Sequence, residues 1–155
     1  MSPDGKWVSY VVTAVDMKEN ASDADVWLVS TAGGPPIRLT TSKKNDNQPR
    51  WSPDGKRLAF ISARGEKPQI FLISPFGGEA EKLTESKSGV QSFQWSPDGN
   101  RIAYVAQQEL SPDEEKKQRR EYGWFSKYVL GIEVPEPRPI VIDKSEKKPE
   151  DKPSH

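Results

Sequence analysis

The residues that could carry hydrolytic chemistry are few, and they are not spaced to work together. A serine nucleophile needs a base that accepts its proton and a carboxylate that orients the base. The sequence has one histidine, His155, at its last position, where nothing would hold it within hydrogen-bond reach of a serine. The sequence also has no Gly-x-Ser-x-Gly nucleophile elbow. We therefore predict that this chain is not an enzyme and assign no catalytic residue.

Two groups of acidic residues have the chemistry of cation ligands. The first group recurs at one position of a repeated turn, where an aspartate commonly bonds its own backbone; its members are Asp4, Asp54 and Asp98. The second group is clustered in one stretch and consists of Asp16, Glu19, Asp23 and Asp25. This cluster lacks the spacing of a calcium-binding loop, so we interpret it as a solvated loop. We predict neither a metal nor a cofactor.

The first group, Asp4, Asp54 and Asp98, belongs to an internal repeat. Ser-Pro-Asp-Gly occurs three times, and tryptophan precedes two of the copies: Ser2, Pro3, Asp4 and Gly5; Trp51, Ser52, Pro53, Asp54 and Gly55; Trp95, Ser96, Pro97, Asp98 and Gly99. The copies are offset by 52 − 2 = 50 and 96 − 52 = 44 residues, and the pairs Gly33-Gly34 and Gly77-Gly78 are also 44 apart. The period is therefore 44, with six extra residues between Tyr10 and Asp25. We expect Asp16 to Asp23 to form a polar loop there.

Each copy contains four candidate strands separated by turn signals. In the second copy they lie around residues 49–51, 57–63, 69–74 and 79–83. The two middle strands are nearly continuous apolar runs, which indicates burial on both faces. Short antiparallel strands that repeat at about 40 to 45 residues are typical of stacked β-propeller blades. Trp51 and Trp95 are then expected to wedge between neighbouring sheets, and the Gly-Gly pairs, which lack a phosphate-loop context, to mark hairpins.

The repeat resembles that of a known family. Trp-Ser-Pro-Asp-Gly at 51–55, Arg-Leu-Ala-Phe at 57–60, Gln-Ile-Phe-Leu-Ile-Ser at 69–74, a Gly-Gly pair and Lys-Leu-Thr at 82–84 look like the propeller repeat of TolB-like proteins. The same repeat forms the N-terminal propeller of bacterial prolyl oligopeptidase family serine peptidases, of the acylaminoacyl peptidase and dipeptidyl aminopeptidase type. The resemblance covers residues 1 to about 106.

The last third departs from the repeat. Ser-Pro-Asp-Glu at 111–114 is a capping box with proline at the first helical position, which predicts a short polar helix over 111–122. We interpret this helix as a solvent-exposed insertion rather than a nucleic-acid-binding or calmodulin-binding element. An aromatic and apolar cluster follows: Tyr122, Trp124, Phe125, Tyr128, Val129 and Leu130. Core packing is the interpretation we favour for it, and a binding patch for peptide or sugar is the alternative.

The sequence thus predicts an all-β fold, an incomplete β-propeller of about three four-stranded antiparallel blades with one short polar helix and a disordered C-terminal tail. The partial propeller is expected over residues 1–143, with blade repeats near 1–47, 48–91 and 92–143 and the helical insertion at 111–122. The tail is expected over 144–155, with 140–142 as the last strand candidate. The abrupt start inside a repeat suggests a cut. Propellers need roughly four to eight blades to hide their strand edges, so we expect the isolated chain to associate.

Composition excludes some partners. Lysine plus arginine equals aspartate plus glutamate at 23 each, so no global field favours nucleic acid or an anionic membrane. No apolar run reaches the roughly 20 residues of a membrane span, and no secretory signal is present. Cysteine is absent, which suits an oxidising or a reducing compartment. Localisation therefore stays open between the bacterial cytoplasm and the periplasm.

The resemblance implies a function. The leading hypothesis is a non-catalytic propeller fragment of a prolyl oligopeptidase family serine peptidase, which gates peptide access to a C-terminal α/β-hydrolase domain with a Ser-Asp-His triad. Its partners would be the missing blades, that hydrolase domain and a peptide substrate or protein partner. The alternative is a TolB-like propeller that binds proteins in the bacterial envelope. A third possibility is a truncated gene product without function.

Overall fold

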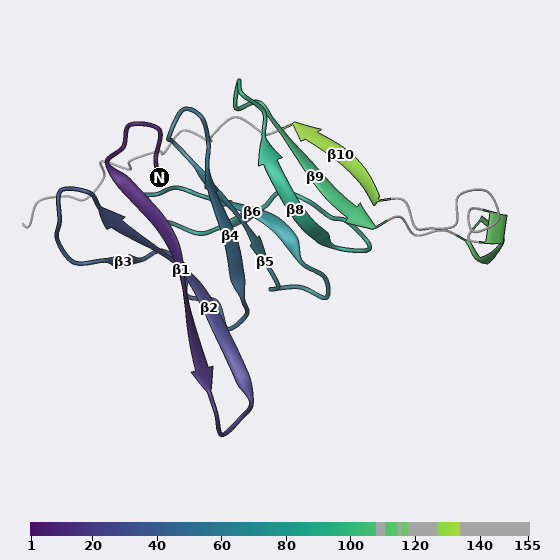
Figure 1. The fold of residues 1–155 in the computed structure, drawn as a ribbon, viewed down its shortest axis with the longest axis horizontal. Coiled ribbons are helices and arrows are strands. Elements are labelled where there is room, and N and C mark those ends of the chain that lie inside the picture. Colours follow the sequence, from purple (N-terminus) through teal and green to yellow (C-terminus); the bar gives the residue numbers. More distant parts are fainter. Residues whose placement is uncertain (108–110, 115, 118–126, 134–155) are drawn as a thin grey trace, which may run out of the picture.

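The computed structural model describes residues 1–107, 111–114, 116–117 and 127–133. They form three antiparallel sheets that lie side by side (Figure 1). Blade 1 contains β1 (Trp7–Asp16), β2 (Ala21–Ser30) and β3 (Ile37–Arg38); blade 2 contains β4 (Asp46–Trp51), β5 (Leu58–Ser62), β6 (Gln69–Ile73) and β7 (Glu81–Lys82); blade 3 contains β8 (Val90–Trp95), β9 (Arg101–Gln107) and β10 (Lys127–Glu133). The chain is therefore an incomplete β-propeller, as the repeat predicts.

Within the described residues, the three blades are not equally complete. The strand order is β1-β2-β3 in blade 1, β4-β5-β6-β7 in blade 2 and β10-β9-β8 in blade 3. Because a Ser-Pro-Asp-Gly turn precedes β1, β5 and β9 alike, β4 and β8 are equivalent first strands. The described part of blade 1 contains no counterpart of β4, and that of blade 3 contains no counterpart of β7.

Apolar side chains fill the two spaces between the blades. One core cluster joins blade 2 to blade 3 and includes Trp95 and Ile70; the other joins blade 1 to blade 2 and includes Val26 and Phe60, with Trp51 packed against it. All of β5 is buried, and so is most of β6. Burial on both faces of these two strands, and the wedged position of both tryptophans, confirm the interpretation of the sequence.

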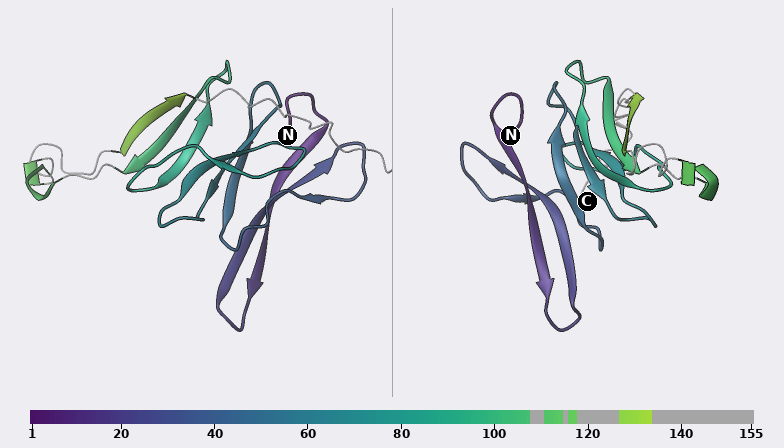
Figure 2. Two further views of the ribbon diagram at one scale, coloured as in Figure 1. Left: turned by 180° about the vertical axis from the view of Figure 1, so that it is seen from behind. Right: turned by 45° about the vertical axis from the view of Figure 1, so that its right-hand side comes forward.

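The prediction of a polar loop over Asp16 to Asp23 is wrong in its extent, because only residues 17–20 form the turn between β1 and β2. The six extra residues lengthen β1 and β2 to ten residues each, paired from Trp7↔Ser30 to Asp16↔Ala21. The resulting hairpin arm projects beyond the sheets (Figure 2). Its β-branched residues, Val11, Val12, Thr13 and Val15, favour the extended backbone and override the polar composition.

The helical insertion is described only in part. Residues 112–114 and 116–117 are helical, and the Ser111 Oγ and backbone N–H both donate to a Glu114 carboxylate oxygen, at 2.8 and 2.9 Å. The rest of the predicted helix, Tyr122, Trp124 and Phe125 of the aromatic cluster, the strand candidate at 140–142 and the predicted tail over 144–155 lie outside the described residues. The other three members of the cluster lie in β10. Among those that are described, no helix has the length and apolar character to cross a membrane.

Candidate functional site

Each Ser-Pro-Asp-Gly turn is closed by one small hydrogen-bond network. In blade 2, Ser52 Oγ donates to Asp54 at 2.6 Å and accepts from the Arg57 backbone N–H at 2.9 Å. Asp54 accepts from the Lys56 backbone N–H at 3.0 Å, and Gly55 takes a φ of 71°. The turns at Ser2 and Ser96 make the same contacts. The serine and aspartate therefore hold the backbone of the turn in every copy.

The hydrogen bonds also shift the acidity of the turn aspartates. Ser2 and the Lys6 backbone N–H hold the pKa of Asp4 below its ordinary value, and Ser96 and Asn100 do the same for Asp98. Burial raises the pKa of Asp54, but the bonds from Ser52 and Lys56 together with nearby positive charge outweigh burial and lower it. All three carboxylates are thus stabilised as anions, which suits acceptors better than general acids.

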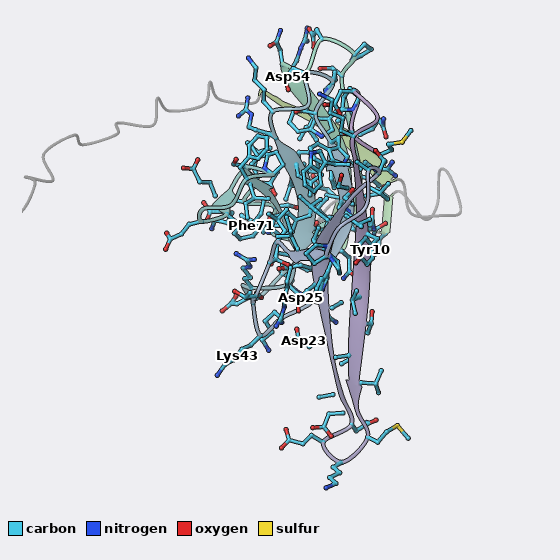
Figure 3. The ribbon with its side chains drawn as sticks, turned by 90° about the vertical axis from the view of Figure 1, so that its left-hand side faces the viewer. Tyr10, Asp23, Asp25, Lys43, Asp54 and Phe71 are labelled. Atoms are coloured by element: carbon cyan, nitrogen blue, oxygen red, sulfur yellow. The ribbon has the colours of Figure 1, made fainter. Side chains whose placement is uncertain are left out.

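The turns stack from one blade to the next. A Cβ built on Gly55 would lie 3.5 Å from Pro3 Cδ, and one on Gly99 would lie 3.4 Å from Pro53 Cδ. The proline of each turn therefore packs on the glycine of the following turn. The turns form a continuous row at one end of the molecule; in Figure 3, Asp54 marks this end and Asp23 lies towards the arm.

Three acidic residues of the cluster in blade 1, Asp16, Asp23 and Asp25, contact other groups of the same chain. Arg38 Nε donates to Asp25 at 3.0 Å, and its Nη2 pairs with Asp25 and lies 3.8 Å from Asp23. Asp16 accepts the backbone N–H of Lys18 at 2.8 Å. Within the described residues, no group of His, Cys, Asp or Glu has the arrangement of a metal site.

The counterpart of Asp25 in blade 2 is a neutral amide. Gln69 accepts from Thr84 Oγ1 at 2.8 Å, and Thr84 Oγ1 accepts the Ile70 backbone N–H at 2.9 Å. Thr40 in blade 1 accepts the Val26 backbone N–H in the same way, at 3.0 Å. Gln69 thus makes in blade 2 the threonine contact that Asp25 makes in blade 1, so this contact does not require a charge.

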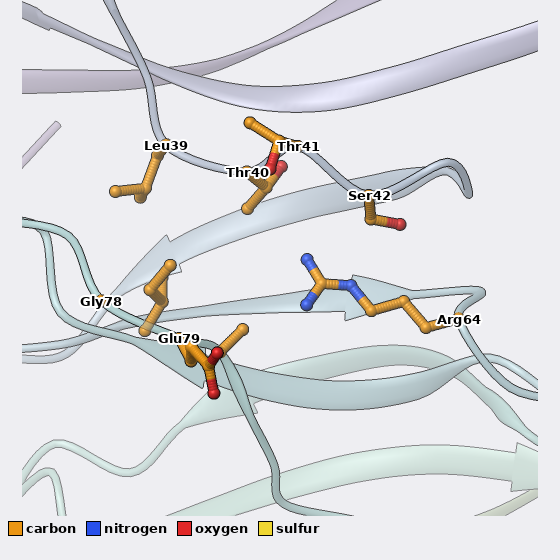
Figure 4. A pocket seen from close by; sticks show the side chains of 9 residues that line it. Leu39, Thr40, Thr41, Ser42, Arg64, Gly78 and Glu79 are labelled. Atoms are coloured by element: carbon orange, nitrogen blue, oxygen red, sulfur yellow. The ribbon is translucent and has the colours of Figure 1, made fainter.

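An open cleft of about 370 Å³ lies between the segment that follows β3 in blade 1 and the segment that joins β6 to β7 in blade 2. Figure 4 shows the Arg64 guanidinium pointing into it, between the segment of Thr40 to Ser42 and that of Gly78 and Glu79. Arg64 Nη2 also bonds the fully buried Asp46 at 2.8 Å. The guanidinium lies 5.2 Å from the Phe71 ring centroid and 5.5 Å from that of Phe60. This cleft therefore contains a charged side chain that a buried carboxylate holds in place.

The sequence reasoning did not identify Arg64 or Asp46 as a pair. A signal was available, because Val90 holds the place of Asp46 in the next copy, so the carboxylate departs from the repeat. The sequence predicted no catalytic residue, and the single histidine, His155, lies outside the described residues.

A second groove of about 490 Å³ runs beside the first strands of the blades. Ser9 of β1, Trp51 of β4 and Trp95 of β8 line it, together with Met1 and the turn prolines. The lining combines proline and tryptophan side chains with polar groups, and the polar part is the larger.

Comparison with known proteins agrees with this architecture. A family model described as the tricorn protease N-terminal β-propeller domain matches residues 19–120. The chain is 38% identical over 70 residues to a protein of Bacillus subtilis called uncharacterized peptidase YuxL, a match that covers 44% of this chain and 11% of the relative.

Solved structures of other proteins share the fold of this chain. A putative TolB from Agrobacterium tumefaciens matches with a TM-score of 0.56 and 28% identity, over 68% of this chain and 36% of that one. An acylaminoacyl peptidase of Pyrococcus horikoshii matches with a TM-score of 0.56 and 25% identity, over 70% of this chain and 17% of that one. The chain thus spans only a small part of the proteins it is similar to.

Proposed function

Because this chain belongs to the family of tricorn protease N-terminal β-propeller domains, we propose that it is a non-catalytic propeller segment that scaffolds a serine peptidase. In this role it limits the access of peptides to a separate α/β-hydrolase domain. The propeller is related both to peptidase propellers and to TolB.

The observation that carries the proposal is the use made of the polar groups in the repeated turns and blade networks. The turn serines and aspartates bond backbone N–H groups, and Asp25 and Asp23 of blade 1 pair with Arg38. The described residues include no histidine; the one histidine of the sequence is His155. Serines and aspartates that hold turns and strands in place support a scaffold role.

The non-catalytic part is tested with the purified 155-residue chain and chromogenic aminoacyl and prolyl substrates. We expect no hydrolysis above buffer. Turnover that a serine-directed inhibitor removes would contradict the proposal.

The gating part is tested by exchange with the Bacillus subtilis relative. The matching segment of its propeller is replaced by blades 1 and 2 of this chain, and is deleted in a second variant. We expect the chimera to cleave short chromogenic peptides and to reject long polypeptides, and the deletion to lose this selectivity. A deletion variant with unchanged size selectivity would refute gating. The chimera with Phe60→Ala in the transplanted core is the matched control for a damaged fold.

A second candidate is a TolB-like propeller for protein binding in the bacterial envelope, which the 28% identity to the Agrobacterium protein favours. Genomic sequence downstream of this reading frame separates the two. A nucleophile elbow followed by aspartate and histidine would support the peptidase, and further blades without a hydrolase would support the binding propeller.

A further inference from the structure

Arg64 is held in the open cleft between blades 1 and 2 by contacts inside blade 2. Its Nη2 bonds the fully buried Asp46 at 2.8 Å, and its guanidinium lies over the rings of Phe60 and Phe71. The Arg64 side chain is still 28% exposed. An arginine has more N–H donors than one carboxylate oxygen can accept, and Asp46 is its one hydrogen-bond partner among the described residues. The guanidinium is therefore fixed in place and keeps donors for a ligand in the cleft.

The carboxylate that holds Arg64 is not needed to build a blade. Val90 takes the place of Asp46 in the next copy of the repeat, and β8 pairs with β9 there in the same way that β4 pairs with β5. A buried ion pair is often no more stabilising than apolar side chains of similar volume. A carboxylate that departs from the repeat and fixes an arginine in an open cleft is better explained by recognition than by packing.

The charges around the cleft favour an anion with a single charge. Asp46 is fully buried, so the side of Arg64 that faces the cleft is positive, and the exposed Lys43 and Lys44 come directly after the segment that lines one wall. Glu79 lies on the other wall, is exposed and makes no ion pair with Arg64 within the described residues. A carboxylate balances this mixed surface, whereas a phosphate, with a charge of about −2, would be repelled by Glu79 and Asp46.

The shape of the cleft suits a side chain presented by a protein. Sites for small molecules bury most of the ligand surface, whereas this cleft of about 370 Å³ is open. Leu39, Ile73 and Ala80 give it an apolar wall, and Thr41 adds an exposed hydroxyl. A glutamate side chain matches this lining, because it has a carboxylate at the end of an apolar stem.

We infer that the Arg64 cleft is a docking site for an exposed glutamate of a partner protein, with its carboxylate bonded to the guanidinium and its stem against Leu39 and Ala80. Arginine and a carboxylate can form two parallel hydrogen bonds, which fix the direction of approach as well as adding affinity. This interaction surface does not depend on the proposed peptidase role.

A blocked peptide tests the inference on the full chain. The probe is acetyl-Ala-Glu-Ala-amide, whose single carboxylate is the glutamate side chain, and its matched control is acetyl-Ala-Gln-Ala-amide. ¹⁵N NMR spectra follow the Arg64 Nε–H and the backbone amides of Thr41 and Gly78 during titration. We expect the glutamate peptide to shift these signals with millimolar affinity, the glutamine peptide to bind about tenfold more weakly, and added salt to weaken binding.

Two variants test the residues without relying on one of them to fold. Arg64→Lys keeps a positive charge beside Asp46 but loses the planar fork, and we expect about tenfold weaker binding. Thr41→Asp adds a negative charge at an exposed position, and we expect about threefold weaker binding, whereas the neutral Thr41→Asn should bind like the unmodified chain. Arg38→Lys, which alters the other arginine–aspartate pair, is the control outside the cleft and should leave the affinity unchanged.

Three outcomes would overturn the inference. The first is equal affinity for the glutamate and glutamine peptides. The second is an affinity for acetate or inorganic phosphate, at the same ionic strength, that equals or exceeds that for the glutamate peptide, which would mean a site for a small anion. The third is unchanged affinity for the glutamate peptide in both Arg64→Lys and Thr41→Asp.

Discussion

Phe60 in blade 2 and Tyr10 in blade 1 occupy the same place in the repeat, but their surroundings differ. Phe60 is fully buried and stacks on Phe71, with ring centroids 6.1 Å apart. Tyr10, labelled in Figure 3, is half-buried and pairs in the ladder with Trp27. Blade 2 has a sheet on each side, whereas the described blade 1 has one on a single side. The local sequence defines each strand, and the neighbouring blade decides how much of that strand is buried.

The largest expected effect compares these two aromatic residues. Phe60→Ala should lower the free energy of unfolding by about 3–5 kcal/mol, because it removes a large side chain from a closed core. Tyr10→Ala should cost about 1 kcal/mol, because its side chain already contacts water. Urea denaturation followed by tryptophan fluorescence measures both. Equal losses would mean that blade 1 is covered in solution as fully as blade 2.

The second comparison concerns the ion pair of Arg64 with Asp46 in blade 2 and that of Arg38 with Asp25 in blade 1. Arg64→Met leaves the fully buried Asp46 unpaired, and we expect a loss of about 2 kcal/mol in the free energy of unfolding. Arg38→Met in blade 1 should cost less, about 1 kcal/mol, because the Arg38 side chain is 43% exposed and the buried Asp25 keeps the Thr40 hydroxyl as a donor.

The buried charge itself can be tested by adding Asp46→Asn to Arg64→Met. The double variant should recover part of the loss, because it removes the unpaired carboxylate. A double variant less stable than Arg64→Met alone would show that Asp46 acts through other contacts.

The repeat explains how much of this molecule the sequence could predict. The Ser-Pro-Asp-Gly spacing located the strands of blade 2 to within a few residues, because one turn type demands proline, aspartate and glycine in fixed order. It could not predict the arm, since Asp16 to Asp23 reads as polar while the pairing of β1 with β2 decides its structure. Nor could it predict Arg64 over Phe60 and Phe71, because that contact joins residues through the tertiary fold.

A smaller effect is expected from the turn serines. Ser52 is buried, and Ser52→Ala removes the hydroxyl that bonds Asp54 and the Arg57 backbone, so we expect a loss of about 1–2 kcal/mol in unfolding free energy. Ser96 makes the same bonds in blade 3 but is more exposed, so water can replace its hydroxyl, and Ser96→Ala should cost about half as much. Urea denaturation of both variants measures the difference. Equal costs would show that exposure does not separate the two turns.

The smallest effect is the contribution of the turn aspartates to acid stability. The pKa of Asp54 is lowered from its ordinary value of 3.8 in the folded chain, so its stabilising contribution is complete above pH 3.8 and is lost as the pH falls through the lower folded value. Because Asp54 is largely exposed, we expect the contribution to stay below about 1 kcal/mol. Urea titrations at several pH values between about 2 and 6 should show a flatter profile for Asp54→Asn than for the unmodified chain. Asp98→Asn, in the more exposed turn of blade 3, should change the dependence of the unfolding free energy on pH least. If the Asp54→Asn profile is as steep as that of the unmodified chain, other groups are responsible for the loss of stability in acid.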